Sequence, residues 1–463
     1  MEYFALLTVA TVIIAVLAAV LYRKRGDAGT LLGIGALYYW SLFGAWYIVI
    51  DKTGGFSGKH YQYLEGKLFP IVLDQNYLVT LGLYAGFVIL VELTLLFTVA
   101  PVSKREPSPV LLRHAPILWI GLGAGLVSLA LVYDKLSAAW ALNVSAYVYT
   151  RAQTDEWFTL HQVLNRVALL PPAIGLAVLA AGKRPRVLVS VGRRYTLPSY
   201  VLLLGAMATF TFVLGNKNEI LAALVAGVLA YIGTARRPKW IGVGLVLAAG
   251  FWFLYAIDLF RAVPLAGLRE EVGGRVEEAT GVARFLTSSN EAYGAHFSMY
   301  GVLSAGVEPR FGYSLYALAS SVIPRVVWPD RPRDIYLYYS ESVGAIQNQG
   351  YSLHHATGWY LNFGYLGVAL GAIIMGLVWA YCLNAHRRTG AGPLFRLFAT
   401  VAPWLFAACL APLIRAGPEG YKGFLIEGVL IPVGVLAFSC RKKHVPAKLA
   451  WHPQRGWVCG AAR

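Results

Sequence analysis

The sequence predicts an all-α, polytopic integral membrane protein, and two observations support this prediction. First, hydrophobic residues make up 57% of the 463 residues and charged residues only 14%, with a mean hydropathy of +0.57. Soluble proteins contain about 25% charged residues, so a soluble chain of this composition could not cover its surface. Second, several apolar runs approach or exceed the length of about 18 residues that marks a transmembrane helix. Soluble enzymes, nucleic-acid-binding modules and secreted disulfide scaffolds are therefore excluded.

The hydropathy profile predicts eleven transmembrane helices. They cover residues 4–22, 30–50, 77–99, 115–133, 161–181, 197–214, 219–234, 240–257, 357–383, 395–414 and 424–439. The chain then divides into eight transmembrane helices in 1–257, a large loop at 258–356, three further transmembrane helices in 357–440 and a basic tail at 441–463. Connections longer than about 15 residues usually carry function, so the large loop is the first region to consider for a site.

The net charge of +17 is a topology signal rather than a sign of nucleic-acid binding. When the connections are sorted alternately, one set contains 23 basic and two acidic residues, and the other contains 17 basic and 20 acidic residues. Short cytoplasmic loops of membrane proteins are enriched in lysine and arginine. The first set is therefore predicted to be cytoplasmic, which places the N-terminus and the large loop outside and the 441–463 tail inside.

The large loop contains two contrasting parts. Residues 261–284 are highly charged and resemble a solvated amphipathic helix, whereas residues 297–328 are half apolar and rich in aromatic side chains. The second part fits one or two interfacial or re-entrant helices on the outer surface. An additional hairpin of transmembrane helices is the alternative, which would give 12 or 13 in total and keep the same orientation.

All eight basic residues of the large loop are arginine. They are Arg261, Arg269, Arg275, Arg284, Arg310, Arg325, Arg331 and Arg333. A guanidinium group binds phosphate or carboxylate through two parallel hydrogen bonds, whereas a lysine acts as a point charge. The three arginines of residues 269–284 have glutamates nearby, and pairing along a helix is the simplest explanation for them. The last three lie in a segment stiffened by three prolines, which orients side chains, so they are candidate anion-binding residues.

Other ionisable groups lie at predicted outer boundaries of the membrane. Lys217 occurs in a very short connection, Arg415 and Tyr421 lie in another, and His354 and His355 precede the ninth predicted transmembrane helix. Ionisable groups at such depth usually face a polar cavity, a partner or the interface. For the two short connections, anchoring to lipid headgroups is the alternative explanation. For His354 and His355 the alternative is a histidine pair on the surface.

The sequence contains no motif for a soluble cofactor or a metal. It lacks a Gly-x-Gly-x-x-Gly turn, a Walker loop, a His-Glu-x-x-His helix and an Asp-x-Asp pair, so we expect neither a cofactor nor a metal site. An enzyme that acts on the outer face has no ATP or nucleotide sugar at its disposal. Lipid-linked diphosphates are its natural activated substrates.

Three stretches resemble motifs of a known family of membrane enzymes. They are residues 311–316 (Phe-Gly-Tyr-Ser-Leu-Tyr), 323–332 (Ile-Pro-Arg-Val-Val-Trp-Pro-Asp-Arg-Pro) and 359–367 (Trp-Tyr-Leu-Asn-Phe-Gly-Tyr-Leu-Gly). The family is that of the Wzy-like O-antigen and oligosaccharide repeat-unit polymerases. In it, a Pro-Arg-x-x-Trp-Pro-x-(Lys/Arg)-Pro segment lies on the outer face, and a Tyr-x-Asn-Phe-Gly-x-x-Gly segment opens the next helix.

This resemblance implies a glycosyltransferase of GT-C-like architecture in a bacterial cytoplasmic membrane, with its active face outside. Such an enzyme transfers a growing glycan from undecaprenyl diphosphate onto the next lipid-linked repeat unit, in the synthesis of O-antigen or a related polysaccharide. The partners it implies are the undecaprenyl-diphosphate-linked oligosaccharide, the lipid bilayer and, in the same pathway, a chain-length regulator and a flippase. Nucleic acid is not among them.

This transfer requires fixed cations for the diphosphate leaving group and a base for the acceptor hydroxyl. We expect Arg325, Asp330 and His355 to be catalytic, and Glu341 and Glu291 are further candidates for the base. The residues expected to bind substrate are Lys217, Arg261, Arg331, Arg333, Glu341, His354, Arg415 and Tyr421. Aromatic side chains of the same region are suited to stacking on sugar faces.

Three other activities stay open at this point. An O-antigen ligase uses the same donor with a different acceptor. A lipid-linked oligosaccharide flippase or transporter is also polytopic, but transporters usually contain internal repeats and ionisable groups near the midplane, which this sequence lacks apart from Glu92. An outer-face acyltransferase with His355 as its base is the third, although no route for a cytoplasmic donor is evident.

Overall fold

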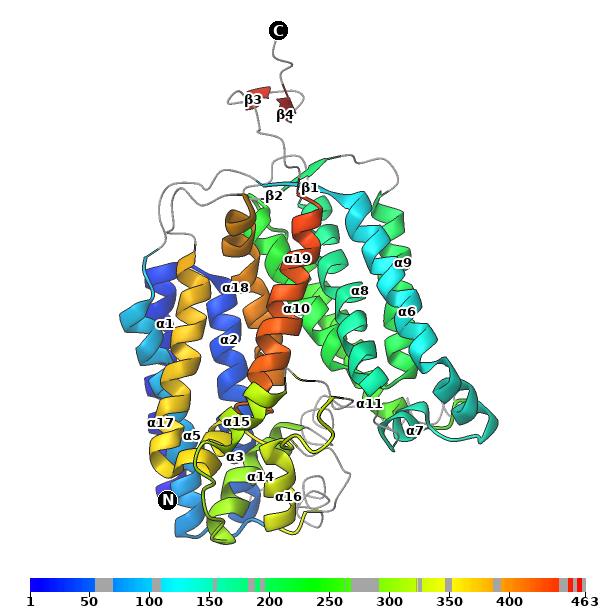
Figure 1. Ribbon diagram of the computed structural model, residues 1–463. Coiled ribbons are helices and arrows are strands. Elements are labelled where there is room, and N and C mark those ends of the chain that lie inside the picture. Colours follow the sequence, from blue (N-terminus) through cyan, green and yellow to red (C-terminus); the bar gives the residue numbers. More distant parts are fainter. Residues whose placement is uncertain are drawn as a thin grey trace. The chain divides into compact units, whose positions relative to one another are not determined.

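The computed structural model contains two compact units, drawn together in Figure 1. It describes residues 1–54, 70–101, 110–152, 156–181, 188–191, 196–261, 263–267, 291–321, 323, 327–345, 352–385, 393–440, 449–452 and 456–459. Unit 1 comprises Met1–Val102, Val272–Asn384 and Cys409–Gly428, and unit 2 comprises Ser103–Glu271, Ala385–Ala408 and Val429–Arg463. Each unit therefore joins segments that are distant in the sequence.

The described residues are mainly helical, as the sequence predicts. Unit 1 contains α1 (Glu2–Arg25), α2 (Ala28–Tyr38), the π-helix η1 (Tyr39–Phe43), α3 (Gly44–Lys52), α5 (Gln75–Thr98), α14 (Glu291–Ser304), α15 (Tyr313–Ser320), α16 (Ile335–Ser342) and α17 (His355–Asn384). Unit 2 contains α6 (His114–Ala141), α7 (Ala146–Ala152), α8 (Glu156–Ala180), α9 (Thr196–Val213), α10 (Asn218–Thr234), α11 (Trp240–Phe260) and α19 (Ile431–Phe438). The helix α18 (Pro393–Ile414) and the π-helix η3 (Lys422–Leu430) have residues in both units.

Two short strand pairs in unit 2 are an addition to the predicted all-α fold. The parallel pair consists of β1 (Val110–Arg113) and β2 (Leu188–Val191), with Val110 opposite Leu188. The antiparallel pair consists of β3 (Leu449–His452) and β4 (Gly456–Cys459), in the predicted tail. Strands of four residues have no hydropathy signal of their own, which explains why the sequence did not predict them.

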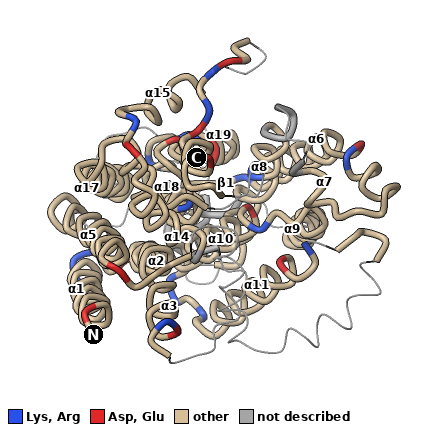
Figure 2. The backbone as a smooth tube through the Cα atoms, turned by 90° about the horizontal axis from the view of Figure 1, so that it is seen from below, with Lys and Arg blue, Asp and Glu red and all other residues tan. Residues whose placement is uncertain are grey.

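The helices of unit 1 pack around α5. Both α1 and α17 contact α5. Tyr77 and Tyr84 of α5 are completely buried. Figure 2 shows α1, α5 and α17 side by side and nearly end-on. The Tyr300 hydroxyl of α14 donates a hydrogen bond to the Asp74 carboxylate (3.2 Å), and the Tyr3 hydroxyl donates to the Asp74 carbonyl (3.2 Å). The beginning of α1 and the large-loop helix α14 therefore lie at the same end of unit 1.

The helices of unit 2 pack around α8, which contacts α6, α9, α10 and α19. Leu170 and Ile174 of α8 are fully buried in this packing. At one end of the unit, the backbone N–H of Arg113, the last residue of β1, donates to the Ser439 carbonyl (2.9 Å). Unit 2 is thus a helical bundle. At this end of it, a backbone hydrogen bond links β1 to Ser439, the residue that follows α19.

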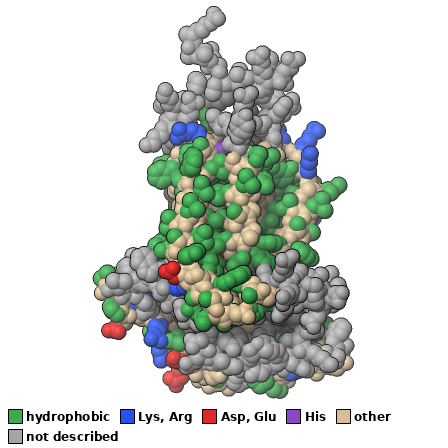
Figure 3. All heavy atoms as spheres, turned by 90° about the vertical axis from the view of Figure 1, so that its right-hand side faces the viewer, with side chains coloured by type: hydrophobic (Ala, Val, Ile, Leu, Met, Phe, Trp, Pro, Cys, Tyr) green, Lys and Arg blue, Asp and Glu red, His purple; other side chains and the backbone are tan. Residues whose placement is uncertain are grey.

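Exposed apolar side chains identify this chain as a multi-pass membrane protein. Trp119 of α6, Leu202 of α9 and Ile241 of α11 are 72%, 72% and 83% exposed. Figure 3 shows hydrophobic side chains over the helices of one face, with charged side chains towards their two ends. Among the described residues, eight helices are long and apolar enough to cross a membrane. Apolar surface of this extent requires lipid around it.

The predicted transmembrane helices correspond to helices of the structure, with differences in length. The eight long apolar helices are Glu2–Arg25, Ala28–Lys52, Gln75–Thr98, His114–Ala141, Leu160–Ala180, Trp240–Phe260, His355–Asn384 and Leu394–Ile414. The predicted helices at 197–214 and 219–234 form the shorter apolar helices Leu197–Val213 and Asn218–Thr234. The last one, predicted at 424–439, is formed by η3 and α19. A total of eleven therefore stays a prediction.

The predicted loops contain more helix than expected. The stretch 134–160 includes the end of α6, which continues to Ala141, and α7. Within 297–328 the structure forms the end of α14 and all of α15, helices of 14 and eight residues. Both are shorter than the ~20 residues of a transmembrane helix, which favours short packed helices over an additional transmembrane hairpin. The charged helix predicted at 261–284 lies largely outside the described residues.

Candidate functional site

The segment from Arg415 to Lys422, here called the 415–422 segment, contacts three parts of unit 1: α17, the beginning of α16 and the residue that follows α15. The Ala416 carbonyl binds α17, Glu419 binds the first residue of α16, and Lys422 binds the residue that follows α15. Helices α15 and α16 belong to the large loop, and α17 follows it. The 415–422 segment therefore joins parts of the chain that lie about 60 to 100 residues away in the sequence.

Two glycines permit this close packing. A Cβ atom on Gly358 of α17 would lie 2.5 Å from Gly417 Cα. A Cβ atom on Gly417 would lie 2.6 Å from Glu419 Oε2 and 2.7 Å from Ile335 Cγ2. Heavy atoms in packed proteins do not approach so closely. A larger residue at either position would therefore push the 415–422 segment away from α17 or α16.

Glu419 provides a largely buried carboxyl group. Its Oε1 accepts a hydrogen bond from the backbone N–H of Ile335, the first residue of α16 (3.0 Å). Burial raises the pKa of Glu419 to about 7, because it outweighs the opposing effect of hydrogen bonds from Ser314 and Ile335. A carboxyl group with this pKa is present in both its charged and its neutral form near neutral pH, so it is able to accept or donate a proton.

Two cations meet at one carbonyl group. Arg331 Nη1 donates to the carbonyls of Ser321 (2.9 Å) and Ile323 (3.0 Å), and Lys422 Nζ donates to the same Ser321 carbonyl (3.0 Å). Both side chains are partly exposed. Because both side chains reach this carbonyl, an anion bound beside Ser321 would interact favourably with both charges. The alternative is a purely structural role, in which these contacts only stabilise the carbonyls that follow α15.

His355, the first residue of α17, uses both ring nitrogens within the protein. Its Nδ1–H donates to the Ala416 carbonyl (2.8 Å), and its Nε2 accepts a hydrogen bond from the indole N–H of Trp359 (3.0 Å). The side chain is fully buried, and the Tyr421 ring packs edge-on against it with 5.2 Å between centroids. A catalytic role for His355 stays a prediction. In this arrangement its nitrogen lone pair points at Trp359, and its contacts hold α17 to the 415–422 segment.

His354 is also fully buried, next to hydroxyl groups. Its Nδ1 accepts a hydrogen bond from the Ala356 backbone N–H (3.1 Å), so Nε2 carries the proton and donates to Ser41 Oγ (2.9 Å). The His354 backbone N–H donates to Ser298 Oγ (3.1 Å). Burial lowers the pKa of His354 well below its usual range, and the neighbouring histidines lower it further. A neutral, enclosed side chain suits the positioning of α17, and substrate binding by His354 stays a prediction.

The two predicted binding residues of the 415–422 segment differ in accessibility. Arg415 is partly exposed. Its Nε donates to Ser352 Oγ (2.9 Å), and its guanidinium carbon lies 5.1 Å from the centroid of the Trp40 ring. Tyr421 is 7% exposed, and burial raises the pKa of its hydroxyl. Arg415 is therefore the more accessible of the two for a ligand.

The Asn-Phe-Gly motif at 362–364 breaks α17 and anchors α15. The Asn362 amide nitrogen donates to Ser314 Oγ (2.8 Å), and its oxygen accepts a hydrogen bond from the Ser314 backbone N–H (2.8 Å). Phe363 and Gly364 leave the helical conformation. Phe363 has φ −143° and ψ 20°, and Gly364 has φ 62° and ψ −145°. The second combination is close to a region that only glycine adopts readily. The motif therefore fixes the first turn of α15 against α17.

Replacing Gly364 with alanine is expected to destabilise the protein by about 1–3 kcal/mol, because a Cβ atom disfavours this backbone conformation. The melting temperature of the purified protein in detergent measures the effect. Gly244→Ala is the control, since the Cβ atom added to this helical glycine of α11 meets no other part of the described chain within 4 Å. A Gly364→Ala protein as stable as the control would contradict the role of this break.

Unit 2 contains a separate charged group at the beginning of α10. Lys217 Nζ donates to both carboxylate oxygens of Asp258 (2.9 and 2.8 Å), and Arg261 Nη1 lies 3.7 Å from Asp258 Oδ1. The Arg261 guanidinium carbon lies 3.7 Å from the centroid of the Tyr147 ring, and Arg261 Nη2 donates to the Tyr147 hydroxyl. The structure thus brings Lys217 and Arg261, two predicted binding residues, to one carboxylate.

The remaining predicted site residues belong to the large loop. Asp330, Arg333 and Glu341 are exposed. Arg325 lies outside the described residues, as does the side chain of Glu291. The predicted roles of all five residues therefore stay predictions. Within the part of the chain that the structure describes, no group of three or more histidine, cysteine, aspartate or glutamate side chains is arranged to hold a metal ion.

Three charged residues of these groups were not predicted as site residues. They are Glu419, Lys422 and Asp258. Glu419 becomes notable only through its burial, and the other two through their neighbours, Arg331 and Lys217. One signal was available for the first two, since the 415–422 segment places an arginine, a glutamate and a lysine within eight residues next to an apolar helix.

Comparison with other proteins assigns neither a family nor a function to this chain. No protein family, no curated protein and no solved structure matches this chain. The functional interpretation therefore rests on the residues described above and on the motif resemblance within 311–367.

Proposed function

We propose that this protein polymerises lipid-linked oligosaccharide repeat units on the outer face of the bacterial cytoplasmic membrane. It transfers the growing glycan from undecaprenyl diphosphate to the next lipid-linked unit. One observation carries the proposal: the 415–422 segment holds the buried carboxyl group of Glu419 and a lysine, Lys422, that meets Arg331 at one carbonyl. A base and a pair of cations are what side chains must supply for transfer from a diphosphate.

In the proposed reaction the acceptor hydroxyl attacks the anomeric carbon of the donor glycan. The bond from this carbon to the diphosphate oxygen breaks as the new glycosidic bond forms, and the hydroxyl proton passes to the Glu419 carboxylate. The departing undecaprenyl diphosphate keeps the electron pair of the broken bond. Arg331 and Lys422 stabilise the charge that develops on its phosphate oxygens through charge-assisted hydrogen bonds.

Other residues position these groups or bind further parts of the substrate. His355 and Asn362 hold α17 to the 415–422 segment and to α15. Lys217 and Arg261, in unit 2, form a second cation group, to which we assign binding of an anionic group of a lipid-linked substrate. From the sequence, the same substrate is expected to contact Arg325, Asp330, Arg333, Glu341 and Arg415.

We also propose eleven transmembrane helices in a GT-C-like arrangement, with the N-terminus and the large loop outside. The excess of lysine and arginine in alternate connections supports this orientation. Within unit 1, the beginning of α1 and the large-loop helix α14 lie at the same end, as the orientation requires.

A cysteine introduced at the exposed Ser342, in a variant without the four native cysteines, is expected to react with an impermeant maleimide in intact cells. The reason is that α16 belongs to the large loop, which the proposed orientation places outside. Labelling is measured before and after the membrane is disrupted. A reaction that occurs only after disruption would reverse the orientation.

The proposed function predicts a ladder of products from a single substrate. With only the native lipid-linked repeat unit present, the purified protein is expected to form longer glycans that remain attached to lipid and differ by one repeat. This pattern follows because donor and acceptor are the same species at different lengths. Gel electrophoresis or mass spectrometry of the products measures their length, and prior hydrolysis of the donor diphosphate should abolish the ladder.

The same assay separates the alternative activities. A ligase leaves the repeat unit unchanged until a different acceptor lipid is supplied, and a flippase moves it between leaflets without changing its mass. If product length never increases with folded protein and its native repeat unit, polymerisation is wrong. Transfer to an added acceptor lipid would then identify a ligase.

A further inference from the structure

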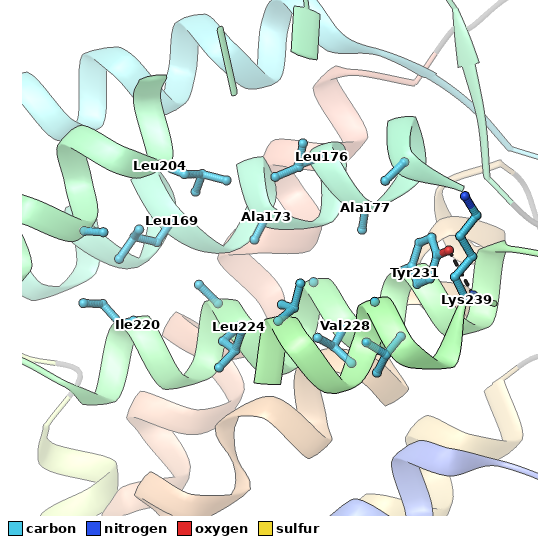
Figure 4. A pocket seen from close by; sticks show the side chains of 17 residues that line it. Leu169, Ala173, Leu176, Ala177, Leu204, Ile220, Leu224, Val228, Tyr231 and Lys239 are labelled. Carbon is cyan, nitrogen blue, oxygen red and sulfur yellow. Dashed lines mark hydrogen bonds between the residues drawn. The ribbon is translucent and has the colours of Figure 1, made fainter. Parts of the chain in front are cut away.

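Unit 2 contains an apolar groove among the helices α8, α9, α10 and α11, with a volume of about 500 Å³. Its larger apolar side chains include Leu169, Leu176, Leu204, Leu224 and Val228. Figure 4 shows such side chains from α8 and α10 facing the space between them, with Tyr231 and Lys239 near one another at one end. The groove therefore has an apolar body and one polar end.

Small residues form part of the walls of the groove. Ala173 and Ala177 of α8, Ala223 and Gly227 of α10, and Gly242 of α11 all line it. Larger side chains at lining positions would take up part of its volume. A space of this size with apolar walls favours apolar ligand groups over water. Its volume falls within the range of about 300–1,000 Å³ found for small-molecule sites.

The polar end of the groove is basic. Lys239 lines it, and Arg236 and Arg237 are exposed in the same connection between α10 and α11. The Lys239 backbone N–H donates to the Tyr231 hydroxyl (3.2 Å), which fixes Lys239 beside the groove. Residues 231–245 contain no acidic side chain. Trp240 is 62% exposed, as is typical of aromatic residues at a bilayer interface.

We propose that this groove binds one acyl chain of an anionic phospholipid, with the phosphate of the headgroup at Lys239. The apolar walls accommodate the chain. The three basic residues favour a negatively charged headgroup, because juxtamembrane lysine and arginine attract anionic lipids. By the charge distribution this end is cytoplasmic, so the lipid belongs to the inner leaflet and differs from the substrate of the proposed polymerase. The proposal does not rest on polymerase activity.

Other occupants match the groove less well. A peptide helix is about 10–12 Å wide with its side chains and needs more space than about 500 Å³ offers. A free phosphate ion would contact only the basic end and leave the apolar walls uncovered. A zwitterionic phospholipid fills the groove but leaves the charge of Lys239 and its two neighbouring arginines unbalanced.

Native mass spectrometry of bound lipid tests this proposal. The full-length protein is exchanged in mild detergent with an equimolar mixture of phosphatidylglycerol and phosphatidylethanolamine. We expect the protein to retain about fivefold more of the anionic phosphatidylglycerol. Lys239→Gln is expected to lower this preference about threefold or more. Arg396→Gln removes an exposed basic side chain of unit 2 that does not line the groove, and it is expected to leave the preference unchanged.

A second variant tests the apolar part. Gly242→Phe places a ring in the groove, and only the Lys239 Cβ, 3.9 Å away, lies near the added Cβ atom. It is expected to reduce retention of both phospholipids. Lys239→Gln changes an exposed side chain, so its result decides the proposal even if Gly242→Phe folds poorly. Equal retention of both phospholipids by the unaltered protein, equal effects of Lys239→Gln and Arg396→Gln, or a polyprenyl phosphate as the bound lipid would each overturn the proposal.

Discussion

Glu419→Gln is expected to slow glycan extension about a hundredfold or more, because glutamine cannot accept the acceptor proton. The glutamine oxygen can still accept the hydrogen bond from the Ile335 backbone N–H, which Glu419 accepts at 3.0 Å, so the start of α16 should keep its place. The rate of ladder formation from a synthetic lipid-linked repeat unit measures the effect. Glu308→Gln is the matched control, since it removes an exposed carboxylate of the same unit and should leave the rate unchanged.

The pH dependence of the rate provides a second measurement of this role. Glu419 accepts a proton only when it is ionised, and its pKa is about 7. The rate of the unaltered protein is therefore expected to rise with pH through about 7 and to level off above it. The residual rate of the Glu419→Gln protein should lack this rise. A variant that keeps both the full rate and the rise would exclude Glu419 as the base, and His355→Gln would then test the base predicted from the sequence.

Stability should follow the opposite trend with pH. The pKa of Glu419 is raised from 4.5 to about 7 in the folded protein, so between these values the folded protein binds more protons than the unfolded chain. Its contribution to folding stability is therefore present below pH 4.5 and is lost as the pH rises to about 7. Glu419→Gln should raise the melting temperature, relative to the unaltered protein, at pH 8 more than at pH 5. This comparison also shows whether the variant is folded.

The membrane helices could be predicted from the sequence because their signal is local. The first helix was predicted at 4–22 and extends over Glu2–Arg25, since a long apolar run both favours helix and requires lipid. The prediction for α6, which ends this helix at residue 133, is too short for the same reason. Hydropathy falls at Asp134 and Lys135, but the backbone continues as helix to Ala141. Hydropathy reports the depth of a residue in the membrane and not the end of its helix.

The candidate site could be predicted only where one residue carries the signal. Charge and position in the sequence predict Lys217 and Arg261, and both lie at Asp258. The part of Asp258 in this group depends on a contact with Lys217 across 41 residues. Glu419 is an ordinary glutamate in the sequence, and its raised pKa arises from the elements packed around it. Resemblance to a family motif points to Asn362, whereas its hydrogen bond to Ser314 depends on how α15 packs against α17. Tertiary packing decides each of these properties.

Arg331→Ala and Lys422→Ala are each expected to lower the extension rate about tenfold or more, which corresponds to about 1.4 kcal/mol of lost transition-state stabilisation. Both side chains bind the Ser321 carbonyl, at 2.9 and 3.0 Å, so both can reach one phosphate group. Residues that act on the same group are coupled, so the loss in the double variant should differ from the product of the two single losses. Arg331→Lys should restore only part of the rate, since lysine lacks the planar fork.

A purely structural role for this pair predicts a different pattern. If Arg331 and Lys422 only stabilise the chain after α15, their loss lowers the melting temperature and the rate together, and inhibition by inorganic pyrophosphate stays unchanged. If they bind the diphosphate, each alanine variant should need about ten times more pyrophosphate for the same inhibition, at a similar melting temperature. Arg310→Gln, at an exposed arginine of the same unit, is the control. Alanine variants that pyrophosphate inhibits as strongly as the unaltered protein would place diphosphate binding elsewhere, and the cation group of unit 2 would be tested next.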